Sequence, residues 1–323
     1  MTRLLVAGKL HPSGEAKLEA LRLQGMMVDY VEEISESSYQ PFIAKADALV
    51  IRTQPLSAAS IAKAENLKVV SRHGVGYDAV DVAALNARAI PLCIVGDVNS
   101  ISVAEHAMML LLAAAKRVIL ADHAVRDPAQ WGWRNRMQAR ELTGKRLLII
   151  GFGRAGRHLA RMAQGFQMQV RAYDPFLQAH GWPDATIEPF SQLEDALAWA
   201  DCLSLHVPRN DKPILGANEL QKLRPGAIIV NTARGGVVDE QALIAALQSG
   251  HIGAAGLDVF DQEPPDGTSP LRQLQNLVLT PHIAGLTDEA AERMALSSID
   301  NALAHLQGRL DPNLIVNWKQ LHV

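Results

Sequence analysis

Short apolar runs rich in valine, isoleucine and leucine alternate along the chain with stretches whose apolar residues recur every three to four positions, as at 13–23 and 57–64. One series of runs falls near 3–7, 26–31, 47–51, 67–71 and 90–94. A second falls near 146–150, 169–173, 202–207, 227–231, 254–259 and 277–280. Strands that alternate with helices build parallel sheets covered by helices. We therefore predict an α/β protein with two doubly wound parallel sheets.

Three further segments lie outside this alternation. The stretch 102–119 is apolar on most faces, and Ser102 and Glu105 have the spacing of a capping box, so we expect a buried helix that starts there. Residues 127–143 are predicted to form a polar connector. A last helix is predicted over 288–307, because Gly308 can end it. In the second series, Asp239 is expected to cap a helix over 240–249.

Composition excludes several classes of protein. The chain has 31 Lys and Arg against 34 Asp and Glu, a net charge of −3, which gives no basic field for nucleic acid or an anionic membrane. The longest apolar run, 107–115, is far shorter than the ~20 residues that span a bilayer, and no signal peptide is visible. Two cysteines, Cys93 and Cys202, cannot form a disulfide framework or a metal cluster. We expect a cytoplasmic protein without metal, nucleic acid or membrane partners.

A glycine-rich turn follows the predicted strand 146–150. Gly151 permits the tight turn, Gly153 lets a pyrophosphate approach the backbone, and Gly156 lets strand and helix pack closely. The next strand ends at Asp174, which can accept hydrogen bonds from the adenosine ribose and would repel a 2′-phosphate. This context favours an NAD site over a glycine-rich turn that only packs a helix on a sheet.

Three side chains that suit hydride transfer follow later strands of the second series. Arg234 can bind a carboxylate in a bidentate fork, and His282 can exchange the proton that accompanies the hydride. Glu263, if paired with His282, favours the imidazolium. Because ligands bind at the carboxyl ends of parallel strands, we expect the three side chains to converge there. Taken singly, each could instead be a surface ion pair, an ordinary loop residue or a buried structural histidine.

Asp258 lies inside an apolar strand, where a buried carboxylate needs a partner. Two interpretations stay open. The carboxylate could accept a hydrogen bond from the nicotinamide amide of a bound coenzyme, or it could form a structural hydrogen bond to a neighbouring turn.

Together these residues resemble the D-isomer-specific 2-hydroxyacid dehydrogenases, and the 3-phosphoglycerate dehydrogenase branch is most similar. The resemblance covers roughly residues 49–291. Its motifs are Ser71–Asp78 (SRHGVGYD), 99–105, the 151–156 fingerprint, 231–236 (NTARGG), 256–265 (GLDVFDQEPP) and 281–285 (PHIAG). At 206–210 the chain has His-Val-Pro-Arg-Asn where the family usually has His-x-Pro-Leu-Thr.

The resemblance implies that Arg234, Glu263 and His282 are catalytic. The coenzyme contacts that it and the fingerprint imply are Gly151, Gly153, Arg154, Ala155, Gly156, Asp174, His206, Val207, Pro208, Thr232, Ala233, Asp258 and Gly285. The substrate contacts are Arg52 and Arg72, which would bind a second anionic group, and the backbone at Gly74, Val75 and Gly76. The family organisation implies a discontinuous, flavodoxin-like substrate domain (1–98 plus 288–323), a Rossmann NAD-binding domain (99–287) and a homodimer joined through the NAD-binding domains.

The functional hypothesis is an NAD-dependent dehydrogenase that interconverts a D-2-hydroxy acid carrying a second anionic group, as 3-phosphoglycerate does, and its 2-oxo acid. One alternative is a hydroxypyruvate or glyoxylate reductase. An alternative of another class is a non-enzymatic NAD-sensing binding protein, and formate dehydrogenase is disfavoured by Glu263. Because the sequence stops at Val323, without the regulatory domain of longer phosphoglycerate dehydrogenases, serine feedback is not expected.

Overall fold

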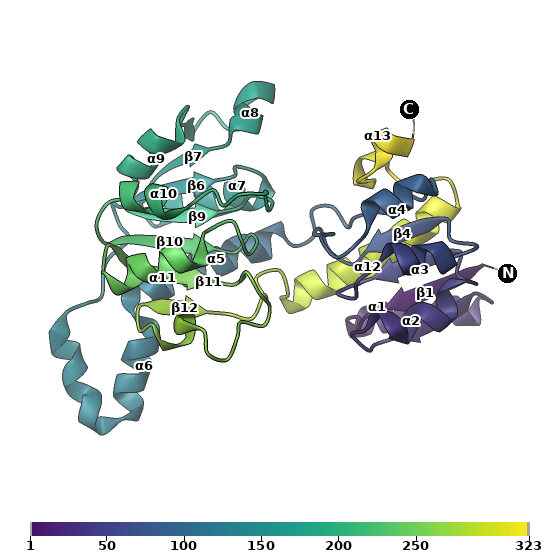
Figure 1. The fold of residues 1–323 in the computed structure, drawn as a ribbon, viewed down its shortest axis with the longest axis horizontal. Coiled ribbons are helices and arrows are strands. Elements are labelled where there is room, and N and C mark those ends of the chain that lie inside the picture. Colours follow the sequence, from purple (N-terminus) through teal and green to yellow (C-terminus); the bar gives the residue numbers. More distant parts are fainter. Residues whose placement is uncertain (1, 322–323) are drawn as a thin grey trace. The chain divides into compact units, whose positions relative to one another are not determined.

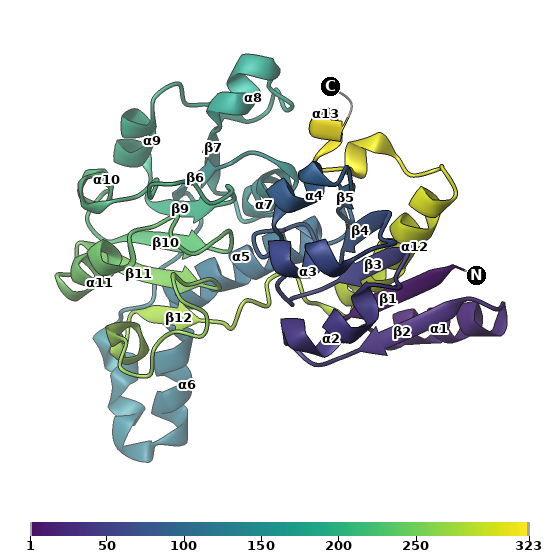
Figure 2. The same cartoon turned by 45° about the vertical axis from the view of Figure 1, so that its right-hand side comes forward.

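A computed structural model describes residues 2–321 and divides the chain into two compact units, Met1–Asn99 with Leu286–Val323, and Ser100–Gly285. Each unit has a parallel β-sheet with helices on both faces (Figures 1 and 2). The predicted fold class is confirmed. Within the described residues, no helix is both long enough and apolar enough to cross a membrane.

The first unit contains a five-stranded sheet in the order β2-β1-β3-β4-β5, the flavodoxin-like order. Its strands are β1 (Arg3–Ala7), β2 (Met27–Val31), β3 (Ala48–Ile51), β4 (Val69–Arg72) and β5 (Leu92–Cys93). One face packs against α2 (Glu36–Ile43), α3 (Ala58–Lys63) and α4 (Val82–Ala87). The other face packs against α1 (Pro12–Leu23) and α12 (Asp288–Leu306), so the end of the chain completes the core that its beginning starts.

The second unit contains a seven-stranded sheet in the order β12-β11-β10-β9-β6-β7-β8. Its strands are β6 (Arg146–Ile150), β7 (Gln169–Tyr173), β8 (Glu188–Pro189), β9 (Cys202–Leu205), β10 (Ala227–Asn231), β11 (Ile252–Leu257) and β12 (Leu277–Leu279). The strand order reverses between β6 and β9, and such a switch point is where open α/β sheets bind ligands.

Helices cover both faces of this sheet. Core residues of α5 (Ser100–Lys116) and α7 (Arg154–Gly165) pack on one face. Those of α9 (Leu193–Trp199), α10 (Ala217–Lys222) and α11 (Glu240–Gln248) pack on the other. As predicted, Asp239 caps α11 by accepting a hydrogen bond from the Ala242 N–H at 3.0 Å. Shorter helices of this unit include α8 (Pro175–His180) and the 3-10 helix Pro270–Gln273, while the 3-10 helix Pro312–Leu314 and α13 (Trp318–Leu321) belong to the first unit.

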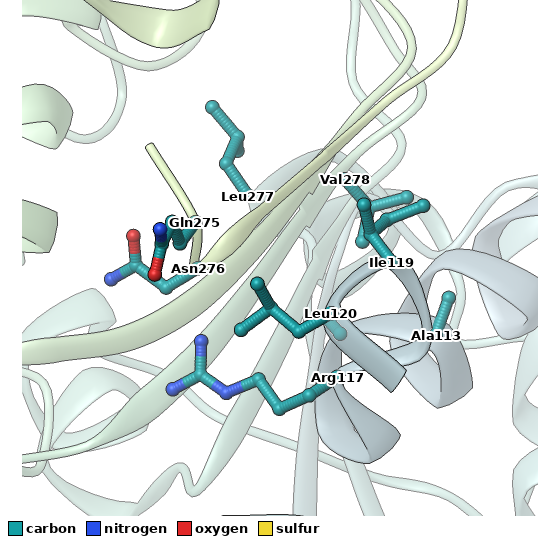
Figure 3. A pocket seen from close by; sticks show the side chains of 9 residues that line it. Ala113, Arg117, Ile119, Leu120, Gln275, Asn276, Leu277 and Val278 are labelled. Atoms are coloured by element: carbon teal, nitrogen blue, oxygen red, sulfur yellow. The ribbon is translucent and has the colours of Figure 1, made fainter. Parts of the chain in front are cut away.

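The predicted helix 102–119 is wrong at both ends. The helix starts at Ser100, so Ser102 is a buried residue of its first turn and not the first residue of a capping box. It ends at Lys116 because Arg117 has a left-handed backbone (φ +53°), and α6 (Val118–Arg126) then begins in a new direction. Figure 3 shows Arg117, Ile119 and Leu120 beside residues 275–278 of the β12 segment.

The predicted connector 127–143 is partly regular, since Pro128–Arg136 forms a 3-10 helix. With α6 it makes an arm that extends from the second unit past β12 (Figures 1 and 2). The sequence pattern misses this element because its side chains are mostly polar and exposed, so no apolar face repeats along it.

Candidate active site

The glycine turn after β6 has the geometry that a dinucleotide requires. Gly151 has a φ of +90°, and a Cβ there would lie 2.4 Å from the carbonyl oxygen of His206. A Cβ on Gly156 would lie 2.4 Å from the Gly151 oxygen, so strand and helix approach closely. A Cβ on Gly153, in contrast, would have no described atom within 4 Å. Gly153 precedes α7 without a side-chain cap, which leaves open space in front of the first N–H groups of that helix.

In the structure α7 runs over Arg154–Gly165, so it begins inside the glycine fingerprint. Arg154 and Ala155 therefore lie in the first turn of the helix, beside the glycines, where the partial positive charge of a helix N-terminus is greatest. This arrangement is compatible with their predicted role as coenzyme contacts.

Asp174 directly follows β7 and faces the glycine turn. One carboxylate oxygen accepts the Phe152 N–H at 2.9 Å, and the other accepts the Leu177 N–H at 3.0 Å, which caps α8. These bonds fix the carboxylate beside the fingerprint. Each oxygen has a second lone pair, so the predicted contact with a ribose hydroxyl stays compatible with this geometry.

The loop after β9 contains His206, Val207 and Pro208, and it packs directly on Gly151. His206 Nε2 is hydrogen-bonded to the Ser204 hydroxyl oxygen at 2.9 Å. Burial lowers the pKa of His206 to about 4, so the ring is neutral at pH 7. After β10, the buried Thr232 hydroxyl has no hydrogen-bond partner among residues 2–321. A buried hydroxyl of this kind is expected to have a partner, and a bound coenzyme would supply one.

Arg234 is positioned by a tight turn at the end of β10. The buried Asn231 side chain accepts the Ala233 N–H at 3.0 Å and donates to the Arg234 carbonyl at 2.9 Å. Gly235 then touches the chain after β11, since a Cβ there would lie 1.8 Å from the Phe260 oxygen. The Arg234 turn is thus fixed against the loop that contains Glu263.

His282 and Glu263 form a hydrogen-bonded pair across two strand ends. His282 Nδ1 lies 2.6 Å from Glu263 Oε2, while Glu263 Oε1 accepts the Phe260 N–H at 3.1 Å. About half of the His282 side chain is exposed, so the rest of the imidazole can meet a ligand. Sequence reasoning predicted this pair, and the structure brings the two residues together.

In this pair the pKa of His282 is raised and the pKa of Glu263 is lowered. The hydrogen bond to Glu263, and then the charges of Glu263 and Asp258, raise the pKa of His282 against the effect of burial and of Arg234. Burial would raise the pKa of Glu263, but its hydrogen bonds and the charges of His282 and Arg234 lower it overall. Arg234 is therefore close enough to act on both members. The pair thus favours the imidazolium form of His282, next to the Glu263 carboxylate.

Asp258 is fully buried, and both of its oxygens accept hydrogen bonds from the turn that contains His282. Oδ1 accepts the Thr280 hydroxyl at 2.6 Å and the Ile283 N–H at 2.9 Å, and Oδ2 accepts the Ala284 N–H at 2.8 Å. The structural interpretation of Asp258 thus describes its contacts here. Gly285 follows this turn directly.

Sequence reasoning missed two polar residues around Asp258. Thr280 donates to its carboxylate, and His106 of α5 lies 2.9 Å from the Thr280 hydroxyl. A histidine within the apolar stretch around 104–115 was the available signal, because such a residue needs a hydrogen-bond partner when buried.

The five predicted substrate residues all belong to the first unit. Arg52 follows β3 and donates to the Lys9 carbonyl at 3.3 Å, and Arg72 ends β4 and donates to the His73 carbonyl at 3.0 Å. Gly74, Val75 and Gly76 come next, with Gly74 at a φ of +140°. They all lie at the carboxyl edge of the first sheet.

Known proteins share this sequence and fold. A family model described as D-isomer specific 2-hydroxyacid dehydrogenase, NAD binding domain, matches residues 108–284. A D-3-phosphoglycerate dehydrogenase of Archaeoglobus fulgidus is 38% identical over 291 residues, which are 89% of this chain and 54% of that protein. A glyoxylate reductase of Korarchaeum cryptofilum is 38% identical over 275 residues, 83% of this chain and 82% of that protein. The crystal structure of the TT0316 protein of Thermus thermophilus superposes with a TM-score of 0.88 at 33% identity, covering 98% of this chain and 100% of that chain.

The doubly wound sheet and its glycine turn define a dinucleotide-binding protein. Since the family model covers more than half of the chain, this chain belongs to the D-isomer-specific 2-hydroxyacid dehydrogenase family, and its second unit is the NAD-binding domain. The chain spans about half the length of the phosphoglycerate dehydrogenases that it matches.

Proposed function

We propose that this protein is an NAD-dependent dehydrogenase that interconverts a D-2-hydroxy acid and its 2-oxo acid. The observation that supports the proposal most is the 2.6 Å His282–Glu263 pair beside Arg234, on the sheet edge that also contains the dinucleotide turn. The D configuration follows the family to which the chain belongs.

The chain's own residues supply binding and proton transfer. Arg234 binds the carboxylate of the oxo acid and polarises the adjacent carbonyl. NADH, held at the glycine turn and by Asp174, would supply the hydride to the carbonyl carbon. His282 uses Nε2 to donate a proton to the carbonyl oxygen, because Nδ1 is engaged by Glu263. The hydroxy acid results, and His282 is neutral until it takes up a proton from water. Glu263 keeps the imidazolium favoured before the transfer.

The substrate is proposed to have a second anionic group that Arg52 and Arg72 bind, while the backbone at Gly74, Val75 and Gly76 binds its carboxylate. The relatives named D-3-phosphoglycerate dehydrogenase support this choice. Relatives named glyoxylate reductase, of which this chain covers 82% and 92%, support a second candidate, reduction of glyoxylate or hydroxypyruvate.

We also propose that two copies of the chain associate through their NAD-binding units. A largely apolar groove of about 500 Å³ lies between α5, the start of α6 and α7, lined by Met109, Leu112, Val118 and Phe166 among others. On the arm and directly after it, Val125, Trp131 and Met137 are also more than half exposed. An apolar surface of this extent is expected to be covered, and a second copy supplies a matching one. Analytical ultracentrifugation should give a dimer, and Val125→Glu should give a monomer.

The activity is tested by following NADH absorbance with a panel of oxo acids: phosphohydroxypyruvate, sulfopyruvate, hydroxypyruvate, glyoxylate, pyruvate and oxaloacetate. Turnover should disappear in the Arg234→Ala and His282→Ala variants. Arg52→Ala should impair the phosphorylated substrate and spare glyoxylate if the first candidate is right. If NADH binds and no substrate is reduced, an NAD-sensing binding protein is the better interpretation.

A further inference from the structure

His106 is a polar residue on the largely apolar helix α5, and only 14% of its side chain is exposed. Its Nε2 lies 2.9 Å from the Thr280 hydroxyl oxygen and 3.5 Å from Asp258 Oδ1. Asp258 follows β11 and Thr280 follows β12. A helix on one face of the sheet therefore reaches two strand ends next to the His282 turn.

The directions of these hydrogen bonds follow from counting protons. The Thr280 hydroxyl has one hydrogen, and the 2.6 Å distance to Asp258 Oδ1 assigns that hydrogen to the carboxylate, which has none to donate. Thr280 Oγ1 can then only accept from His106, so His106 Nε2 bears a hydrogen. The result is a series of two hydrogen bonds, in which His106 donates to Thr280 and Thr280 donates to Asp258.

Asp258 extends this series to the backbone of His282 and of the two residues that follow it. Its carboxylate accepts the N–H groups of Ile283 and Ala284, and its main-chain carbonyl accepts the His282 N–H at 2.8 Å. His282 itself has a left-handed backbone, with a φ of +55°. That conformation is unfavourable for a residue with a Cβ and persists only where its surroundings fix it.

We propose that His106 is a positioning residue for His282, acting through Thr280 and Asp258. The N–H of His106 orients the Thr280 hydroxyl toward Asp258, and the carboxylate in turn fixes the left-handed turn that keeps His282 against Glu263. The inference rests on the proposed function for what His282 does, whereas the bonds from His106 to the turn are independent of any substrate.

The groups that face His282 determine what a looser turn would change. They are Glu263, which is hydrogen-bonded to it, and the charges of Asp258 and Arg234. The first two favour the imidazolium and Arg234 opposes it. A turn that relaxes away from Glu263 and Asp258 should therefore lower the pKa of His282 toward its ordinary value.

The experiment compares His106→Ala with His106→Gln, which keeps an N–H donor near the Nε2 position. His251→Ala is the matched control. The His251 ring is likewise hydrogen-bonded, to the Leu220 main-chain oxygen at 3.0 Å, but His251 precedes β11 and so lies at the opposite edge of the same sheet. The readouts are the pKa of His282 from NMR titration of ¹⁵N-labelled histidines, assigned with His282→Gln, and the pH profile of kcat/KM for the best oxo acid.

His106→Ala should lower the NMR pKa of His282, shift the alkaline fall of kcat/KM to lower pH and reduce kcat/KM by about tenfold, as misplacement of a reacting group does. His106→Gln should stay within about threefold of the wild type, and His251→Ala should match it. Should His106→Ala fold poorly, Thr280→Val removes the same connection and should act in the same direction.

Two results would overturn the inference. One is an unchanged His282 pKa and an unmoved alkaline limb in His106→Ala, even where rate and Tm fall together. The other is a Gln variant as impaired as the Ala variant. If the wild type reduces no oxo acid, the proposed function fails, and the NMR titration still decides the positioning role.

Discussion

Replacing Glu263 with glutamine isolates the electrostatic part of the candidate site. The substitution preserves a side-chain oxygen that can accept from His282 Nδ1 and removes the negative charge that lies 2.6 Å from it. A hydrogen bond to a charged partner contributes about 1.5–3 kcal/mol. Because half of the His282 side chain and 37% of the Glu263 side chain are exposed, solvent screening favours the lower end. A loss of about 1.5 kcal/mol corresponds to roughly tenfold in the population of the imidazolium.

The sign of the effect follows from which form of His282 reacts. Reduction of an oxo acid needs protonated His282, so kcat/KM falls as pH rises through the His282 pKa. In the wild type, the hydrogen bond to Glu263 and the charges of Glu263 and Asp258 raise that pKa. In Glu263→Gln the fall should begin at lower pH. The two proteins should converge in acid and differ by about tenfold at alkaline pH.

The assay is NADH oxidation at several concentrations of the preferred oxo acid from pH 5 to 10. Glu240→Gln is the control, because Glu240 is another carboxylate at this edge but its side chain accepts the Asp261 N–H at 3.3 Å and not His282. If kcat/KM of Glu263→Gln is lower than that of the wild type by the same factor at every pH, the electrostatic reasoning is refuted. Glu263 would then only orient the His282 ring.

Three further predictions test separate parts of the structure. Gly153→Ala should leave Tm unchanged, since a Cβ there meets no described atom within 4 Å, yet it should weaken NADH binding in a fluorescence titration by about tenfold or more. In the control Gly165→Ala, the new Cβ also meets no described atom within 4 Å, so NADH binding should be unchanged and the protein should gain about 0.5–1 kcal/mol of stability. Asp174→Ser should raise the NADPH-to-NADH ratio of kcat/KM by about tenfold, because it removes a charge that repels a 2′-phosphate; an unchanged ratio would contradict the role of Asp174. Burial, with the charges of Arg52 and Arg72, lowers the pKa of His73 to about 4, so the unfolded chain binds a proton at this residue before the folded chain does. The free energy of unfolding in urea should therefore fall by about 1.6 kcal/mol between pH 6.5 and 5, and His73→Asn should lack this fall.

The fold was predictable because both sheets are buried on two faces and their strands are unbroken apolar runs. The runs near 146–150 and 169–173 coincide with β6 and β7 for this reason. The ends of α5 were not predictable from the same pattern. Ser102 and Glu105 have the spacing of a capping box, yet the helix starts two residues earlier. It ends where Arg117 has a left-handed backbone, and no glycine beside Arg117 indicates this conformation in the sequence.

The convergence of Arg234, Glu263 and His282 was predictable because parallel strands bring their carboxyl ends to one edge. The partners of Asp258 were not. Its hydrogen bonds depend on a turn more than twenty residues away and on His106, more than 150 residues away, and on the register of β11 with β12. Residue type alone leaves a buried carboxylate with two interpretations, and only the packed turn shows which backbone groups Asp258 bonds.

The backbone conformation of His282 gives a physical reason for the buried Asp258 carboxylate next to it. A histidine that must face a ligand and also bond Glu263 has its ring direction fixed by the backbone, and here the backbone is left-handed, at a cost of roughly 1–2 kcal/mol. Asp258 accepts the two following N–H groups in a fully buried setting, and hydrogen bonds to a charged acceptor each offset about that amount. The buried charge stabilises the strained turn, and the same charge favours the imidazolium. One residue thus couples the geometry of the proposed acid to its protonation, so substitutions at Asp258 should alter both together.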